Sequence, residues 1–441
     1  MNSTRPGDSA QVGGDMTTNR WLPFLLALLS VAPAALRAEG LTTDEQKLVA
    51  FVDAHRADFV AELERAVNID SATENLAGVK QMGAVFSADL AALGFNSRFV
   101  ELPASTQRAG HLIADRTGAK GKRLLLIGHL DTVLHGGNWR RDGDTAHGAG
   151  TNDMKGGDLV IIHALRALHS IDALEGTSIT VVMTGDEEAP GNPLSISRRD
   201  LVAAAQHSDL ALAFETAIDN FGTIARRGIV SWTLDVQGAT GHSSGIFSAA
   251  VGSGSIYEAS RILTGFHEQL SKIDGVTLNP AMIVGGTQAG FDGNAGTASG
   301  KTNIIAQHTV AKGDLRYLSA EQMKQAQAAM QAIVAEHFPR TSAVLTFADD
   351  SFPAMAPTPA NYALLAQLDQ ASRDLGFGPV TAYDPKARGA GDISFISPPL
   401  PGLDGLGIRG SGAHAPTETA DLATAPELVK RTALLIYRLT R

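Results

Sequence analysis

Apolar runs typical of buried strands alternate with segments of helical apolar spacing along most of the chain. The run Leu-Leu-Leu-Ile at 124–127 is followed by Gly128 and predicts a central strand buried on both faces of a sheet. Further elements are expected around it: helices over Val79–Leu93 and after Gly157, and strands over 97–102, 111–115, 123–127 and 178–183. Strands separated by helices are typical of a βαβ sheet, so this part of the chain predicts an α/β domain.

The pattern changes near Arg226. The segment 228–238 alternates apolar and polar residues, as expected of a half-exposed strand. The elements expected after it are a helix over 251–270, strands over 278–284 and 303–318, a helix over 320–337 and a strand over 342–347. The order β-α-β-β-α-β is the ferredoxin-like motif, a compact unit that can fold as an insertion. The Gly-rich segment 289–300 is expected to be a flexible loop between two of these strands.

These two patterns predict an interrupted catalytic domain. A chain of 441 residues is too long for one ordinary core. Alternation of helix and strand resumes after the Pro-rich segment 351–359. We therefore expect a catalytic α/β domain formed by 39–225 and 354–441, with a smaller α+β domain inserted at 226–353.

The N-terminal residues carry a signal of their own. Arg20 precedes "WLPFLLALLSVAPAAL", an apolar stretch of the length of a signal-peptide core and too short for a comfortable membrane span. We expect a signal peptide over 1–38, cleaved between Ala34 and Ala38, with export to the periplasm or beyond and no stable membrane anchor. Translation could equally begin at Met16.

Composition narrows the possible partners and chemistry. The formal net charge of −10 argues against a nucleic-acid or anionic-membrane surface, because no strong positive field is present to bind phosphates. The sequence contains no Cys, which excludes disulfides, thiolate ligands and a Cys nucleophile. An anionic substrate would need a local basic pocket.

Histidines and carboxylates follow several of the predicted strands. In open α/β sheets, ligands bind beyond the carboxyl ends of the strands. A hydrolytic two-metal site needs imidazole and carboxylate ligands from several strand ends, and one further carboxylate that can move protons. The candidate side chains are His129, Asp131, Asp153, Glu187, Glu188, Glu215 and His414.

Each of these motifs has an ordinary alternative when it is taken alone. His129 and Asp131 could belong to a surface loop, and the acidic run 186–188 to a solvated turn. The Gly-rich turn around Asp153 could bind a phosphate, although it lacks the Gly-Lys-Ser/Thr spacing of a P-loop. The combination favours a metal site, because so many coincidences at the strand ends of one sheet are improbable.

The motifs "GHLDTV", "GAGTNDMKGG", "GDEE", "FET" and "GAHAPTE" occur in this order, with the α+β insertion before the last. This set resembles the M20 metallopeptidase family, most closely its glutamate carboxypeptidase-like branch. The resemblance implies a three-layer αβα catalytic domain of the zinc-peptidase type, with a ferredoxin-like lid and dimerisation domain. It also implies two zinc ions per subunit, with Co²⁺ or Mn²⁺ as alternatives: one bound by His129 and Glu215, the other by Glu188 and His414, and both bridged by Asp153.

The resemblance assigns the remaining candidates to proton transfer and to substrate binding. Glu187 is expected to be the general base and acid, taking a proton from the attacking water and returning it to the leaving amine. Asp131 is expected to orient His129. His242, in "VQGATGHSSG", is expected to reach the neighbouring subunit's site in a homodimer and to stabilise the oxyanion. The carboxylate of the substrate is expected to be bound by Asn303 and Arg316.

One loop departs from the family's pattern. Where relatives often show Gly-Gly-Gly-Thr-Asp, this chain has "KARGAGDIS" at 386–394, which keeps Gly and Asp but lacks the Thr. Lys386 and Arg388 beside it are interpreted as surface charges, with contact to an acidic substrate side chain as the alternative. His135 and His147 lie near ligand motifs and are interpreted as ordinary loop residues.

The sequence thus predicts an exported dizinc exopeptidase or amidase that acts on a small peptide or an N-acyl amino acid. It would cleave the amide next to a free carboxylate and release a C-terminal amino acid, with glutamate expected from the family branch. An N-acyl-amino-acid deacylase or a dipeptidase would use the same residues. A non-catalytic periplasmic metal-dependent binding protein is the alternative of another class, although such a protein would not need Glu187.

Overall fold

The computed structural model describes residues 40–441. The expected signal peptide over 1–38 lies outside the described residues. Within the described range, no helix has both the length and the apolar character needed to cross a membrane.

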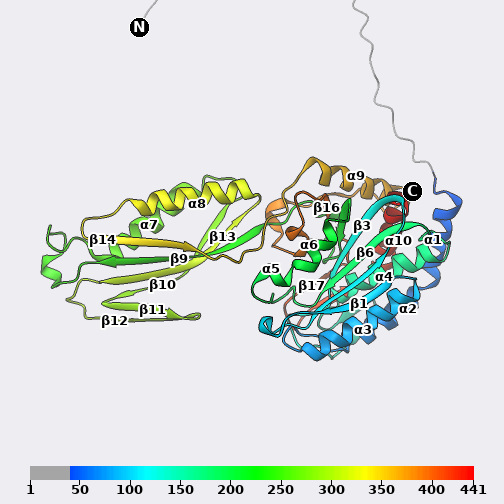
Figure 1. The fold of residues 1–441 in the computed structure, drawn as a ribbon, viewed down its shortest axis with the longest axis horizontal. Helices are drawn as coiled ribbons and strands as arrows, with labels where there is room; N and C mark the ends of the chain where they lie inside the picture. The colour runs from blue at the N-terminus through cyan, green and yellow to red at the C-terminus, as the bar shows by residue number, and fades with distance from the viewer. Residues whose placement is uncertain (1–39) are drawn as a thin grey trace, which may run out of the picture. The chain divides into compact units, whose positions relative to one another are not determined.

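The larger domain is built on a six-stranded mixed sheet (Figure 1). Its strands, in spatial order, are β1 (Asn96–Glu101), β2 (Gly110–Arg116), β6 (Thr177–Thr184), β3 (Lys120–His129), β7 (Leu210–Ala213) and β16 (Gly402–Leu403). The four strands from β6 to β16 are parallel, whereas β1 and β2 run antiparallel to their neighbours. The sheet is therefore not parallel throughout, since the short connection between β1 and β2 permits only an antiparallel pair.

Strand β3 is buried on both faces, as its aliphatic run predicts. Leu124 and Leu126 belong to one hydrophobic cluster, and Leu125 and Ile127 belong to another on the opposite face. Helices that contribute to the first cluster are α1 (Thr43–Ala54), α2 (Arg56–Val67), α3 (Leu76–Ala92), α4 (Lys155–His169), α9 (Pro359–Asp374) and α10 (Ala425–Leu439). The opposite face is covered by α6 (Arg199–Ala205), which follows the short helix α5 (Leu194–Ser197), and by the turn at 392–396. These are the three expected αβα layers.

Two small sheets bring distant loops together. One has the order β17 (Gly410–Ser411), β18 (Thr419–Asp421), β5 (Thr145–His147), β4 (Arg140–Asp142). The other pairs β8 (Phe221–Gly222) with β15 (Thr381–Ala382). The pairing of β18 with β5 matters for the site, because the loop after β5 and the loop between β17 and β18 become neighbours.

The inserted domain has the predicted ferredoxin-like order. Its elements are β9 (Gly228–Gly238), α7 (Gly254–Leu270), β10 (Thr277–Gly286), β13 (His308–Tyr317), α8 (Ala320–Ala335) and β14 (Thr341–Phe347). The four strands form one antiparallel sheet in the order β10-β13-β9-β14. Both helices lie along the sheet (Figure 1) and share one core with it. In this core Trp232 packs edge-on against Phe266.

Two details of this domain differ from the sequence prediction. The segment expected to be a flexible loop is a hairpin of β11 (Gln288–Asp292) and β12 (Ala295–Ser299), closed by a two-residue turn in which Gly293 has φ 56°. A glycine turn of this kind favours a hairpin. Strand β13 begins at His308, whereas the sequence predicts a strand from Asn303. The backbone of 303–305 instead hydrogen-bonds to residues 241–243.

Candidate metal centre

The candidate ligands meet at one edge of the central sheet. Strands β6, β3 and β7 are parallel neighbours, so their carboxyl ends lie side by side. His129 ends β3, Glu187 and Glu188 follow β6, and Glu215 follows β7. Asp153 lies two residues before the start of α4, and His414 lies between β17 and β18.

Asp153 lies between the two imidazoles. Its Oδ1 is 3.4 Å from His129 Nε2, and its Oδ2 is 3.1 Å from His414 Nε2. Glu188 Oε2 is 3.1 Å from His414 Nε2, and Glu215 Oε1 is 3.9 Å from His129 Nε2. The side chains thus form two groups, each with one imidazole and one carboxylate of its own, which share Asp153.

The donor atoms fit divalent cations. His129 Nε2 and Glu188 Oε1 are buried without a hydrogen-bond partner, although buried polar atoms are normally paired. Ligand atoms of His129, Asp153 and Glu188 lie within 4.8 Å of one another, as do those of His129, Glu187 and Glu215. Imidazole nitrogens with carboxylate oxygens are donors that zinc prefers.

Protons occupy this cluster when no cation is bound. Hydrogen bonds to Asp153 and Glu188 raise the pKa of His414 to about 11. Burial by itself would lower the pKa of His129, but its interactions with Asp131 and Asp153 outweigh burial and raise that pKa well above its usual range. Cation binding must therefore displace protons from the imidazoles.

Glu187 has the properties of a proton carrier. Burial, reinforced by the negative charges of Glu215 and Asp392, raises the pKa of Glu187 well above its usual range. One of its carboxylate oxygens lies beside the ligand atoms of His129 and Glu215. A carboxyl group that holds a proton more tightly than usual is suited to general acid and base chemistry near neutral pH.

Asp131 holds both His129 and the acidic loop, residues 186–188, which follows β6. The Nδ1 of His129 is 3.0 Å from the main-chain oxygen of Asp131 and 3.5 Å from its Oδ1. The carboxylate of Asp131 accepts the backbone N–H groups of Glu187 at 3.0 Å and Glu188 at 3.1 Å, and the hydroxyl of Thr73 at 2.7 Å. Asp131 therefore orients His129 chiefly through its carbonyl, while its side chain fixes the two glutamates.

A pair of glycines allows α4 to approach the end of β7. A Cβ on Gly157 would lie 2.0 Å from the carbonyl oxygen of Phe214, and one on Gly156 would lie 2.3 Å from that of Thr151. No larger residue fits at these positions without movement of the backbone. The close approach brings Asp153, just before α4, to Glu215, just after β7.

The three candidate residues of the inserted domain, His242, Asn303 and Arg316, lie near opposite ends of β13. His242 and Asn303 are neighbours, because the N–H of Ser243 donates to the carbonyl of Asn303 at 2.9 Å. Arg316 is eight residues beyond His308, the first residue of β13, which corresponds to roughly 26 Å along an extended strand. One chain therefore brings His242 and Asn303 together but does not present Asn303 and Arg316 to the same carboxylate.

Lys386 and Arg388, in the loop at 386–394 that differs from the family's pattern, have different surroundings. Lys386 is exposed and pairs with Asp274, as a surface charge does. Arg388 is half-buried, and its Nη2 donates to the carbonyl of Thr216 at 3.1 Å. The interpretation of Arg388 as a surface charge is therefore wrong, because its guanidinium is held against the residue that follows Glu215.

Other polar residues around the centre carry no motif in the sequence. Arg198 is buried and bonds to Asp186 at 2.6 Å and to Asp392 at 2.7 Å, which anchors the start of the acidic loop. Arg226 is buried, and its Nη2 lies 3.8 Å from Glu215 Oε2. Neither arginine could have been assigned from local spacing, since Arg198 meets Asp392 across 194 residues and Arg226 donates to Asp404 across 178.

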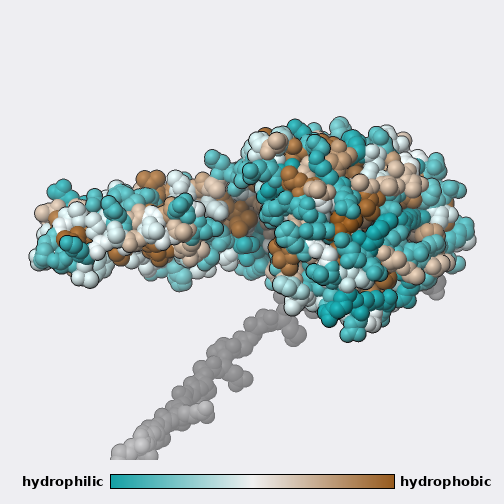
Figure 2. Space-filling model, turned by 90° about the horizontal axis from the view of Figure 1, so that it is seen from below, coloured by the Kyte–Doolittle hydropathy of each residue, from teal (hydrophilic) through white to brown (hydrophobic). Residues whose placement is uncertain are grey.

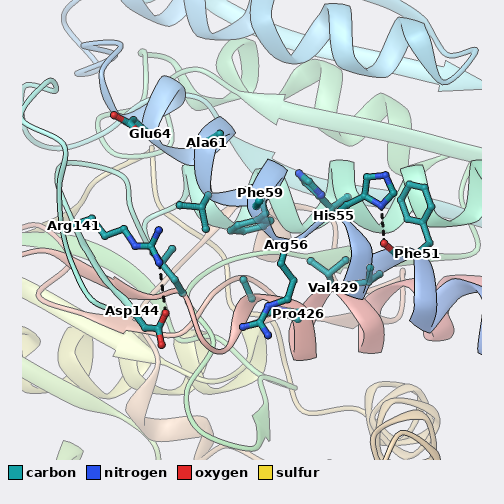
Figure 3. A pocket seen from close by; sticks show the side chains of 16 residues that line it. Phe51, His55, Arg56, Phe59, Ala61, Glu64, Arg141, Asp144, Pro426 and Val429 are labelled. Carbon is teal, nitrogen blue, oxygen red and sulfur yellow. Dashed lines mark hydrogen bonds and ion pairs between the residues drawn. The ribbon is translucent and has the colours of Figure 1, made fainter.

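A separate pocket of about 360 Å³ is lined by α1, α2 and α10 (Figure 3). Phe51, Phe59 and Val429 contribute to its walls, and Arg56 extends toward Pro426. None of the candidate cation ligands lines this pocket. This pocket is therefore separate from the candidate metal centre.

Comparisons with known proteins show the family to which the chain belongs. Residues 125–438 match the model of peptidase family M20/M25/M40. Carboxypeptidase G2 of Pseudomonas sp. (strain RS-16) is 26% identical over 416 residues, which cover 90% of this chain and 90% of that protein. Succinyl-diaminopimelate desuccinylase of Sphingopyxis alaskensis is 33% identical over 178 residues, which cover 36% of this chain and 46% of that protein.

Solved structures share the fold. Aminopeptidase PepT from Bacillus cereus superposes with a TM-score of 0.68 at 17% identity, covering 88% of this chain and 99% of that one. Human carnosine dipeptidase 1 superposes with a TM-score of 0.57 at 15% identity, covering 90% and 99%. The family match spans most of the chain and includes every candidate cation ligand. The chain therefore belongs to peptidase family M20/M25/M40 and is a hydrolase of that family.

Proposed function

We propose that this protein is a two-metal exopeptidase or amidase that hydrolyses the amide bond next to a free C-terminal carboxylate. The observation that carries the proposal is the position of Asp153, which faces His129 with one carboxylate oxygen and His414 with the other. Glu187 lies beside this cluster. One carboxylate that faces two imidazoles suits a pair of cations, and a spare carboxylate suits proton transfer.

Zinc is the proposed metal, with Co²⁺ or Mn²⁺ as alternatives. His129 and Glu215 would hold one ion, Glu188 and His414 the other, and Asp153 both. When bound, such ions polarise a carbonyl and make water more acidic. The proposed set leaves Glu187 free for other chemistry.

The chain's own residues then account for proton movement. Glu187 takes the proton of the attacking water at its carboxylate oxygen and delivers it to the nitrogen of the leaving amine. Asp131 keeps Glu187 in place by accepting its backbone N–H at 3.0 Å. Arg316 is the proposed partner of the substrate carboxylate, because a guanidinium binds carboxylates in a planar, two-point fashion.

The proposed leaving group is glutamate or another amino acid. Support comes from the similarity to carboxypeptidase G2 along 90% of the chain. A deacylase of N-acyl amino acids is the second candidate, favoured by the local similarity to succinyl-diaminopimelate desuccinylase. The two candidates share one site and differ in the group on the acyl side of the amide.

We further propose export and a homodimer formed through the lid. The sequence of 1–38 supports export. Exposed large hydrophobic side chains on the inserted domain support the dimer: Phe247, Ile256, Tyr257, Ile283 and Val344. On the face seen in Figure 2, hydrophobic residues form small groups among hydrophilic ones. His242 and Asn303, which lie together away from Arg316, would then act in the partner subunit's site.

The test is a substrate panel on zinc-loaded protein that lacks 1–38. Dipeptides and N-acyl amino acids with acidic, aliphatic and basic C-terminal residues are incubated with it, and free amino acids are measured by mass spectrometry. Release of a C-terminal amino acid that a chelator abolishes is expected. Two bound metals with no release from any substrate would contradict the proposal and favour a binding protein.

A further inference from the structure

The carboxylate of Glu418 accepts several backbone hydrogen bonds next to the candidate metal centre. Glu418 is buried, with 5% of its surface exposed. Its Oε2 accepts the N–H of Gly150 at 2.9 Å, and its Oε1 accepts those of Asn152 at 3.0 Å and Asp153 at 3.1 Å. Both oxygens of this side chain are thus bonded to the backbone of one loop, the loop that carries the shared ligand.

The loop is shaped to receive an anion. Gly148 has φ 138° and Gly150 has φ 82°, conformations that favour glycine. These turns direct the backbone N–H groups of Gly150, Asn152 and Asp153 to one carboxylate, so the loop resembles an anion-binding nest. Glu418 occupies the nest, so the alternative that this Gly-rich turn binds a phosphate is excluded for the described conformation.

Asn152 ties the same loop to its neighbours on both sides. Its Nδ2 donates to the carbonyls of Ser411 at 3.0 Å and Thr419 at 2.6 Å, on strands β17 and β18. Its Oδ1 accepts the hydroxyl of Thr216, next to Glu215, at 3.0 Å. The residue before Asp153 is therefore bonded to two of the other segments that supply candidate ligands, those of His414 and Glu215.

We propose that Glu418 is a positioning residue that sets the Asp153 loop in its cation-binding conformation before any cation arrives, with Asn152 as its partner. The inference rests on the proposed function for the role of Asp153 as the shared ligand. Glu418 acts through the backbone, because none of its hydrogen bonds reaches a ligand side chain. Its negative charge also adds to the attraction that the site exerts on cations.

The variant that tests this is Glu418→Gln. An amide keeps one accepting oxygen but sets an N–H₂ group against the loop's N–H donors. Zinc affinity is measured by competition with a chromophoric chelator on metal-free protein. We expect about 10- to 100-fold weaker binding, the usual effect of losing a residue that orients metal ligands.

Glu427→Gln is the matched control. Glu427 bonds to Arg409 at 2.6 Å and to Arg431 at 2.7 Å, and neither bond involves the Asp153 loop. Its loss weakens an ion-pair network without touching the nest, so zinc affinity should stay within about threefold of wild type. Zinc affinity of Glu418→Gln within that same range would overturn the inference.

Hydrogen exchange tests the preset loop without any substitution. In metal-free wild-type protein, the amides of Gly150, Asn152 and Asp153 should exchange slowly, because each donates to Glu418. Exchange at the rate of an open loop would overturn the inference even if Glu418→Gln fails to fold. Wild-type protein that binds no cations would overturn the proposed function instead, and the exchange measurement would still decide this inference.

Discussion

At the scale of single residues, protons and cations compete for the same atoms. In the metal-free protein, hydrogen bonds to Asp153 and Glu188 raise the pKa of His414 to about 11, from 6.5. These interactions of protonated His414 stabilise the folded, metal-free protein. Their contribution is fully present below the ordinary pKa of histidine and is lost as the pH rises toward about 11. A bound cation removes the same proton at neutral pH.

We therefore expect zinc affinity to increase between about pH 6 and about pH 8, with protons released on binding. Calorimetry in buffers of different ionisation enthalpy measures the number of protons released. Affinity that does not change with pH, or binding without proton release, would contradict the assignment of His414 as a ligand.

Proton transfer is tested at Glu187. Glu187→Gln should lower kcat by about 10²- to 10⁴-fold, because the amide cannot accept the proton of water. Its zinc content, measured by elemental analysis, should equal that of wild type, since the proposed ligand set does not include Glu187. Glu175→Gln, at a side chain that is 73% exposed, is the control. Turnover within tenfold of wild type would refute the role.

At the scale of elements, the position of α4 decides whether the ligands meet. Gly157→Ala would place a methyl group 2.0 Å from the carbonyl oxygen of Phe214. We expect a loss of about 1–3 kcal/mol in the free energy of unfolding from overpacking, and weaker zinc binding because Asp153 shifts. Denaturant unfolding and metal titration measure the two effects.

Gly290→Ala, on β11, is the control for Gly157→Ala, because a Cβ on Gly290 would have no other atom within 4 Å. It should leave both the free energy of unfolding and the zinc affinity close to wild type. Equal stability of Gly157→Ala and wild type would show that α4 can move away from β7 at no cost.

At the scale of the whole molecule, the cluster joins segments that are far apart in the sequence. Cations that bind only the folded chain stabilise it, by about 2.7 kcal/mol at a concentration 100 times the Kd. We expect a chelator to lower the Tm of wild-type protein, as measured by calorimetry. His129→Ala, which lacks one proposed ligand, should show a smaller shift. Equal shifts for both would place the metals elsewhere.

The proposed dimer predicts complementation between inactive subunits. His242→Ala and Glu187→Ala should each be inactive as homodimers. After mixing and subunit exchange, heterodimers contain one complete site, so about one quarter of wild-type activity should return. Mixtures that remain inactive while exchange is demonstrated would refute a shared site.

The periodicity of the sequence predicts much of the fold because it is a local property. The aliphatic run of β3 requires burial on both faces, and the order of elements after Arg226 predicts the ferredoxin-like sheet. His129, Glu188 and Glu215 could be proposed as ligands for the same reason, since each lies at or after the end of an apolar strand. Asp153 and His414 lie in Gly-rich loops, so their roles are proposed from the resemblance to the family. The hairpin at 288–299 was missed because glycines favour both turns and flexible loops.

Only the tertiary structure decided which residues become partners. The bond from the Asp153 N–H to Glu418 spans 265 residues, and Arg198 meets Asp392 across 194. It likewise decided that Arg388 is held against Thr216, and that Asn303 and Arg316 lie apart. The physical reason is that apolar periodicity records only what lies inside or outside, whereas hydrogen-bond partners are selected by the packing of elements that are distant in the chain.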